Sequence, residues 1–115
     1  MSAQSLALLT LSVVSASALT ADRFITHAGG VPAAGDNCLG VNRSKADAAG
    51  EIVPVDVIGT AVVDSGAAIA ANALIQTDAQ GRAITKAAGA TLARLAPGQV
   101  ATAAGQKVEV LLIVN

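Results

Sequence analysis

Apolar and polar residues alternate along much of this 115-residue chain, and glycines interrupt the alternation at fairly even intervals. The clearest run covers residues 51–63, EIVPVDVIGTAVV, in which Val53 and Val55 share one side of an extended strand. Pro54 cannot donate a ladder hydrogen bond, so we expect it at a sheet edge or a bulge. Gly59 is expected to bend the run. Turn residues placed between such runs favour a small β-sandwich or β-barrel of short strands.

Shorter segments with the same pattern predict further strands, at residues 23–26, 38–41, 67–70, 73–77 and 82–85. Asp78 and Gly81 favour a tight turn between the last two, which should form a hairpin. Residues 86–95 are rich in alanine and could form one or two helical turns. Gly89 and Thr91 argue against a long helix there, so the expected class is all-β with little helix.

The last segment, KVEVLLIVN over residues 107–115, predicts a final strand. One of its faces carries aliphatic residues only: Val108, Val110, Leu112 and Val114. Leu111 and Ile113 make the far end of the other face apolar as well. A strand end that is apolar on both sides belongs in a core or at an interface, so Leu111 and Ile113 are candidate interface residues.

An apolar stretch over residues 6–14 precedes the first charged residue, Asp22. From Leu9 onward it alternates as a strand does. Residues 1–20 are therefore predicted to form an N-terminal β-arm that docks on a neighbouring molecule, and residues 21–115 a single β-domain. The candidate contact residues of this arm are Leu6, Leu9, Leu11 and Val13.

The same stretch permits a second interpretation, a cleaved secretion signal. Ala16-Ser17-Ala18 resembles a signal-peptidase site, although no basic residue precedes the apolar stretch. The protein would then be a secreted or periplasmic β-rich binding or adhesive module. The run is too short to span a bilayer, so no membrane partner is expected.

Composition points towards an assembly component. Apolar residues make up 53% of the chain, yet it has one Phe and neither Trp nor Tyr. Aromatic side chains bury about 150–250 Å² each, and that contribution is almost absent. A core of small aliphatic side chains gives a marginal monomer, and packing against neighbours is the simplest remedy.

Charge and chemistry exclude several function classes. Only 13% of residues are charged, the net charge is −1 and the seven cations are scattered, so no nucleic-acid partner is expected. The carboxylates are spread singly, and the lone Cys38 fits a buried small hydrophobe. No metal, cofactor or disulfide is therefore predicted.

Catalytic motifs are also lacking. His27 is the only histidine and lies beside turn glycines, so a small hydrolase built around it is the weakest of the three hypotheses. Gly30 and Gly35 have the spacing of a phosphate-binding loop, but Asp36 and Asn37 follow where Lys and Ser or Thr are required. No catalytic residue is assigned, and the protein is not expected to be an enzyme.

The order of the punctuated strands resembles a known family. AGGVPAAGDNCLGV, then KADAAGEIVPVDVIGTAVVDSGAAIAANALIQTDAQGRAI, then KVEVLLIVN are similar to the small capsid decoration, or cement, proteins of tailed bacteriophages. The matching positions include Gly35 and Asp36 and residues 39–41, 49–51, 53–59, 67–69 and 78–83. The resemblance covers residues 21–114, and the apolar residues 6–14 are a departure from the pattern.

This resemblance implies a non-enzymatic structural protein of the virion. It would bind the outer surface of the capsid and bridge neighbouring major capsid subunits, after synthesis in the host cytoplasm. The expected partners are the major capsid protein and further copies of the chain itself, as a homotrimer rather than a dimer.

Overall fold

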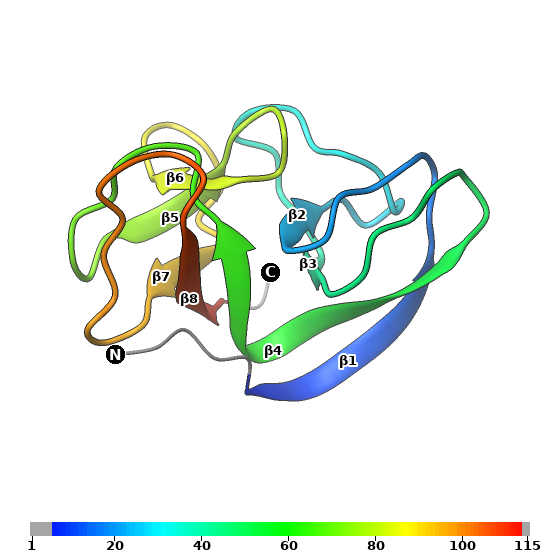
Figure 1. Ribbon diagram of the computed structural model, residues 1–115, viewed down its shortest axis with the longest axis horizontal. Helices are drawn as coiled ribbons and strands as arrows, with labels where there is room; N and C mark the ends of the chain where they lie inside the picture. Colours follow the sequence, from blue (N-terminus) through cyan, green and yellow to red (C-terminus); the bar gives the residue numbers. More distant parts are fainter. Residues whose placement is uncertain (1–5, 114–115) are drawn as a thin grey trace.

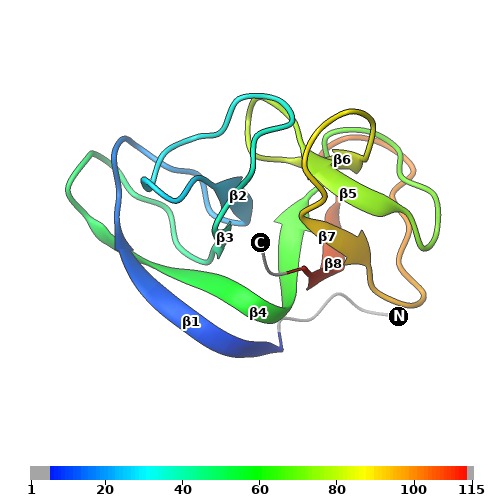
Figure 2. The ribbon, with the colours of Figure 1, turned by 180° about the vertical axis from the view of Figure 1, so that it is seen from behind.

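The computed structural model describes residues 6–113 of the chain. Within that range every regular element is a β-strand: β1 (Ala7–Val14), β2 (Arg23–Ile25), β3 (Gly40–Asn42), β4 (Ile52–Asp64), β5 (Leu74–Thr77), β6 (Ala83–Thr85), β7 (Ala93–Leu95) and β8 (Lys107–Leu112). They form one sheet in the order β2-β3-β4-β8-β7-β5-β6, and β1 pairs with β4 outside this path. Figures 1 and 2 show the sheet curled around the centre of the molecule. The predicted all-β class is confirmed.

The two ends of the strand path approach each other and nearly close a barrel. The Phe24 N–H in β2 donates to the Gly81 carbonyl, just before β6, at 2.7 Å. Ser65, directly after β4, forms a parallel bridge with Ala83 in β6. The edges of β2 and β6 are therefore largely covered by the chain itself.

β4 is the longest strand and serves both halves of the sheet. Its first part pairs with β1 on one edge and β3 on the other, whereas Thr60 to Asp64 pair with β8. Gly59 lies at the junction with a φ of 106°. A Cβ at this position would lie 2.4 Å from the Leu6 carbonyl oxygen, so only glycine fits. Figure 1 shows β4 turning sharply along its length, as the sequence predicted.

Pro54 lies where the ladder between β3 and β4 ends. The last regular partners of these strands are Asn42 and Val55, and the Pro54 carbonyl accepts one further bond from the Arg43 N–H at 2.9 Å. In a strand the N and C=O of one residue face the same neighbour. The missing N–H of Pro54 therefore falls where this ladder ends, inside a strand with neighbours on both sides, and not at the sheet edge or bulge expected from the sequence.

The hairpin predicted over residues 73–85 is confirmed. β5 and β6 pair antiparallel, with Thr77 opposite Ala83. Asp78 holds the turn between them, because its Oδ1 accepts from the backbone N–H groups of Gln80 at 2.9 Å and Arg82 at 2.8 Å. Gly81 has a φ of 78°, the positive value that favours glycine in such a turn.

Buried apolar side chains form two clusters. The main cluster lies between the strands of the barrel and includes Phe24, Val63, Ile75 and Val110. A second, smaller cluster consists of Leu19, Ile25, Ala46, Val53 and Val55, with Val13 packed against it. Most of both clusters is aliphatic, as the composition required.

Several expected strands differ in the structure. Residues 67–70 form no named strand, and Ile69 makes only an isolated bridge to Ala101. The third strand is Gly40–Asn42 instead of residues 38–41. Ala93–Leu95, within the segment that could have formed a helical turn, is β7, because pairing with β5 and β8 outweighs the helix propensity of alanine. Val114, expected on the same face of the last strand as Val108 and Val110, lies outside the described residues.

The N-terminal segment is a strand, as predicted, and pairs with its own chain. β1 runs antiparallel to β4, with Val13 opposite Val53. The buried Ser15 continues the attachment, because its N–H donates to the Glu51 carbonyl at 2.7 Å and its hydroxyl to the Ala48 carbonyl at 3.0 Å. Leu19 then bridges Ala46 inside the second cluster. Residues 6–20 are therefore packed against the domain that follows them.

Candidate interaction surface

Large aliphatic side chains are exposed mainly in one part of the molecule. Ten such residues are exposed in the part of the chain that the structure describes. Eight of them lie on or beside β1, at the start of β4 and at the end of β8: Leu6, Leu8, Leu9, Leu11, Val14, Ile52, Leu111 and Ile113. We call these eight residues the aliphatic surface. Val31 and Val100, in loops elsewhere, complete the ten.

Three of the six predicted interface residues, Leu6, Leu9 and Leu111, have their backbones close to the bend of β4. The Leu6 carbonyl accepts from the Thr60 N–H at 3.2 Å, and Thr60 is also the strand partner of Leu111. Leu9 is opposite Ile58, two residues earlier in β4. A fourth, Ile113, follows directly after the end of β8 at Leu112.

The other two predicted interface residues lie further along β1. Leu11 is opposite Val55 and is exposed, whereas Val13 is opposite Val53 and is partly buried against the second cluster. Val13 therefore contributes mainly to packing within the chain. Leu8, which sequence reasoning missed, has 82% of its surface exposed, more than any other large aliphatic side chain described.

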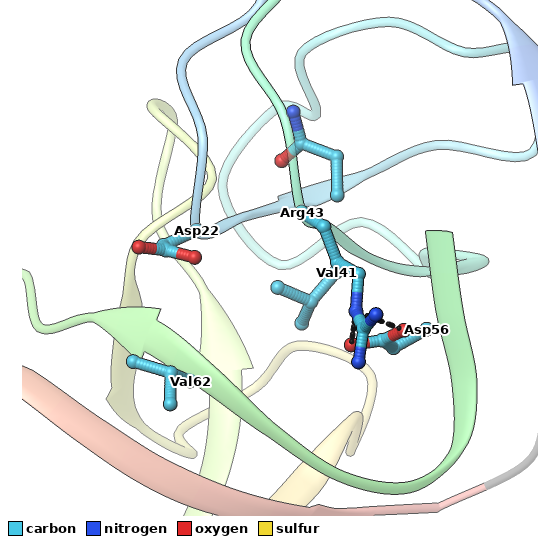
Figure 3. A pocket seen from close by; sticks show the side chains of 6 residues that line it. Asp22, Val41, Arg43, Asp56 and Val62 are labelled. Atoms are coloured by element: carbon cyan, nitrogen blue, oxygen red, sulfur yellow. Dashed lines mark hydrogen bonds and ion pairs between the residues drawn. The ribbon is translucent and has the colours of Figure 1, made fainter. Parts of the chain in front are cut away.

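A shallow pocket of about 320 Å³ lies between the two halves of the sheet, lined by Asp22, Val41, Asn42, Arg43, Asp56 and Val62. Figure 3 shows the Arg43 guanidinium against the carboxylate of Asp56, which projects from β4. The Arg43 Nε lies 2.9 Å from that carboxylate, and the Thr10 hydroxyl donates to it at 2.9 Å. The charged side chains here already hold β1, β3 and β4 together, which is a structural role.

A second group of charges ties the two sheet halves beside this pocket. The Arg23 Nε lies 2.8 Å from the Asp64 carboxylate, and the Lys107 Nζ contacts both Asp64 and Asp22. Burial alone would raise the pKa of Asp64, but hydrogen bonds and charges from Lys107 and Arg23 outweigh burial and lower it. The hydrogen bond to Asp64 raises the pKa of Lys107. Both shifts favour the charged forms of Asp64 and Lys107 at neutral pH.

The Asp64 network predicts an acid-dependent contribution to stability. Because the pKa of Asp64 is lower in the folded state, its contribution is present above the ordinary value of 3.8 and is lost as the pH falls through the folded value. Asp64→Asn should cost about 2 kcal/mol at pH 7. Urea unfolding of both proteins at pH 7 and at pH 3 should show this difference shrinking. An equal difference at both pH values would contradict the role of the ionised carboxylate.

The structure also defines the surroundings of Cys38, His27 and Asn42. Burial, with a smaller effect of Asp36, raises the pKa of the Cys38 thiol to about 12, so Cys38 is a buried, protonated residue as predicted. His27 is exposed in a turn closed by the bond from the Gly29 N–H to the Thr26 carbonyl. The Asn42 side chain is fully buried and donates to the Ser44 carbonyl at 2.9 Å.

Within residues 6–113, no group of three or more His, Cys, Asp or Glu side chains is arranged to hold a metal ion. No helix in this range is long and apolar enough to cross a membrane.

Comparison with known families completes this description. A family model described as phage cement protein matches residues 3–113. The chain belongs to the phage cement protein family. This confirms the resemblance found in the sequence, and the match includes the apolar segment that forms β1.

Among solved structures, the head fibre gp8.5 N base of bacteriophage phi29 is similar to this cement protein. The TM-score is 0.73 over 91% of this chain and 93% of that one, at 16% sequence identity. At this identity the likeness concerns the fold alone. No curated protein sequence matches the chain. Membership of the family gives the cement protein a structural, capsid-associated role in the virion.

Proposed function

We propose that this cement protein binds the outer surface of a phage capsid and stabilises it by bridging neighbouring major capsid subunits, without catalysing a reaction. The exposed aliphatic surface carries the proposal. A chain with few aromatic residues leaves eight large aliphatic side chains in water on β1, at the start of β4 and at the end of β8. Such surface is costly to expose and is typical of an interaction site.

The position of this surface suits a bridging role. Its residues lie near the bend of β4, along β1 and at the start of β4, and Figure 1 shows that the two parts of β4 run in different directions. Burying apolar area contributes about 25 cal/mol per Å², and one molecule offers only a small patch. Many copies on a closed shell act together, so modest contacts of each copy sum to a large resistance to subunit separation.

Self-association belongs to the same proposal. A homotrimer, made in the host cytoplasm and placed between several capsid subunits, would present three copies of the aliphatic surface at once. Closed cyclic symmetry of this kind gives each copy the same contacts. Sedimentation equilibrium of the purified cement protein would test the trimer directly.

The main prediction concerns Leu111, which is 48% exposed and pairs with Thr60, just after the bend of β4. Leu111→Ser should lower the affinity for purified empty shells of the same phage at least tenfold, because it removes apolar area from the contact. Co-sedimentation with the shells over a range of protein concentrations measures this. Deletion of residues 1–14 is a poor test, since β1 covers part of the second cluster.

Val100→Ser is the matched control, because Val100 is 52% exposed but lies in a loop away from the aliphatic surface. It should bind the shells as the unchanged protein does. Equal binding by the two serine variants would contradict the assignment of this surface. Failure of the unchanged cement protein to bind would contradict the proposed function as a whole.

A further inference from the structure

β1 has one edge paired with β4 and one edge that faces away from the sheet. The Ser15 N–H, just after β1, donates to the Glu51 carbonyl on the β4 side. Alternate residues of a strand point their N–H and C=O groups to opposite edges. Leu11 and Val13 therefore direct these groups to β4, and Thr10 and Ser12 direct theirs outward.

The outer edge ends abruptly at Val14. A Cβ on Gly29 would lie 2.3 Å from the Val14 carbonyl oxygen, so the turn at residues 26–30 lies directly against the edge at this point. The Ala16 N–H then donates to the Gly29 carbonyl at 2.9 Å. No backbone bond from another described residue reaches the outward groups of Thr10 and Ser12. The unpaired part of the outer β1 edge therefore ends at Val14, where the turn containing Gly29 covers it.

The two end strands of the sheet are covered, because β2 and β6 meet through the Phe24–Gly81 bond and the Ser65–Ala83 bridge. β1 pairs with β4 only, so its outer edge lies outside this closed arrangement. Proteins usually protect such edges with Lys, Pro or inward charges. β1, with the sequence ALLTLSVV, has none of these.

We propose that this edge receives an extended strand of a capsid subunit, which adds to the sheet beside Thr10 and Ser12. This inference rests on the proposed function and specifies how part of the contact is made. Main-chain hydrogen bonds would supply the affinity, as in other cases of strand addition. The incoming strand should be uncharged and alternate aliphatic residues, opposite Leu9 and Leu11, with short polar ones opposite Thr10 and Ser12.

A bulge at Leu8 argues for a capsid strand over a second copy of β1. The register of β1 on β4 shifts on both sides of Leu9, which leaves Leu8 as an extra residue without a β4 partner. Bulges increase twist and interrupt edge pairing. Two copies of β1 would both bring this irregularity into a shared ladder, whereas a strand of different sequence can begin beyond it. The regular part, from Thr10 to Val14, pairs with β4 without interruption.

Ser12→Pro tests the inference. Proline removes the outward N–H of residue 12 and leaves the bonds from Leu11 and Val13 to β4 in place, and an edge strand tolerates it. Ser12 is exposed. Ser12→Ala keeps the N–H and is the matched control. We expect Ser12→Pro to bind empty shells of the same phage at least tenfold more weakly, while Ser12→Ala binds normally and both keep the circular dichroism spectrum of the unchanged protein.

Hydrogen exchange on the unchanged cement protein gives a second readout that does not depend on a variant's folding. The amide of Ser12 should exchange at least tenfold more slowly on shells than in solution. Normal shell binding by Ser12→Pro, or unchanged exchange at Ser12, would overturn the strand-addition inference and leave the proposed function intact. Dimers that Ser12→Pro converts to monomers, with shell binding unaffected, would assign the edge to a second copy instead.

Discussion

Gly59→Ala should destabilise this cement protein by roughly 3 kcal/mol or more, enough to lower its melting temperature by more than about 10 °C. The added Cβ would lie 2.4 Å from the Leu6 carbonyl oxygen and 2.9 Å from the Leu8 nitrogen. Both are backbone atoms, which cannot move aside without detaching the beginning of β1. The φ of 106° adds strain for any residue with a side chain. Thermal unfolding followed by circular dichroism measures the loss.

Gly50→Ala separates the effect of the steric clash from the effect of the positive φ. Gly50 also has a positive φ, of 91°, but a Cβ there would meet no atom within 4 Å. Its replacement should cost only the backbone strain, about 1–2 kcal/mol. If the two alanine variants lost the same stability, the close approach of β1 to the bend would not matter energetically. Shell binding should fall with Gly59→Ala at temperatures where Gly50→Ala still binds, because the bend brings the start of β1 and the end of β8 to the same part of β4, at Thr60.

Asp56→Asn is expected to cost about 2–4 kcal/mol. The Asp56 side chain is 2% exposed, and it accepts from the Thr10 hydroxyl and from Arg43. Removing one partner of a buried ion pair leaves the other charge poorly compensated, although Arg43 is partly in water and the cost is reduced accordingly. The amide would also turn donor groups towards Arg43, which has no acceptor. Urea unfolding at pH 7 measures the change.

Asp47→Asn is the matched control for Asp56→Asn. Asp47 is paired with Lys45 at 3.5 Å, but both side chains are more than 70% exposed. Its replacement should change stability by less than about 0.5 kcal/mol. Equal effects of the two substitutions would mean that the carboxylate linking β1, β3 and β4 has no special part in holding them together.

The local patterns in the sequence predicted much of the fold. The valine alternation of residues 51–63 became β4, and the Asp78–Gly81 turn became the hairpin between β5 and β6. These features depend on neighbours in sequence, where side-chain periodicity and turn chemistry act directly. β7 is three residues long, too short for any periodicity, and it forms because β5 and β8 are on either side.

Long-range pairing was beyond what the sequence could predict. The alternation at Leu9 to Val13 indicated a strand, but nothing local distinguishes pairing with β4 from pairing with another molecule. The ion pair between the buried Asp56 and the partly exposed Arg43 was also missed. Its one signal was a single acid inside a run of valines, a position where an uncompensated charge would be expensive. A partner thirteen residues away could be identified only once β3 and β4 were paired.

The path of β4 also determines how the molecule unfolds. Its first half forms a wall of the second cluster through Val53 and Val55, and its last half forms a wall of the main cluster through Ala61 and Val63. If either cluster lost its packing, β4 would be displaced, and the other cluster also needs β4 in place. Although the apolar interior is divided in two, the cement protein should melt as a single cooperative unit. A capsid that pulls on one end of it would thus be resisted by the whole fold.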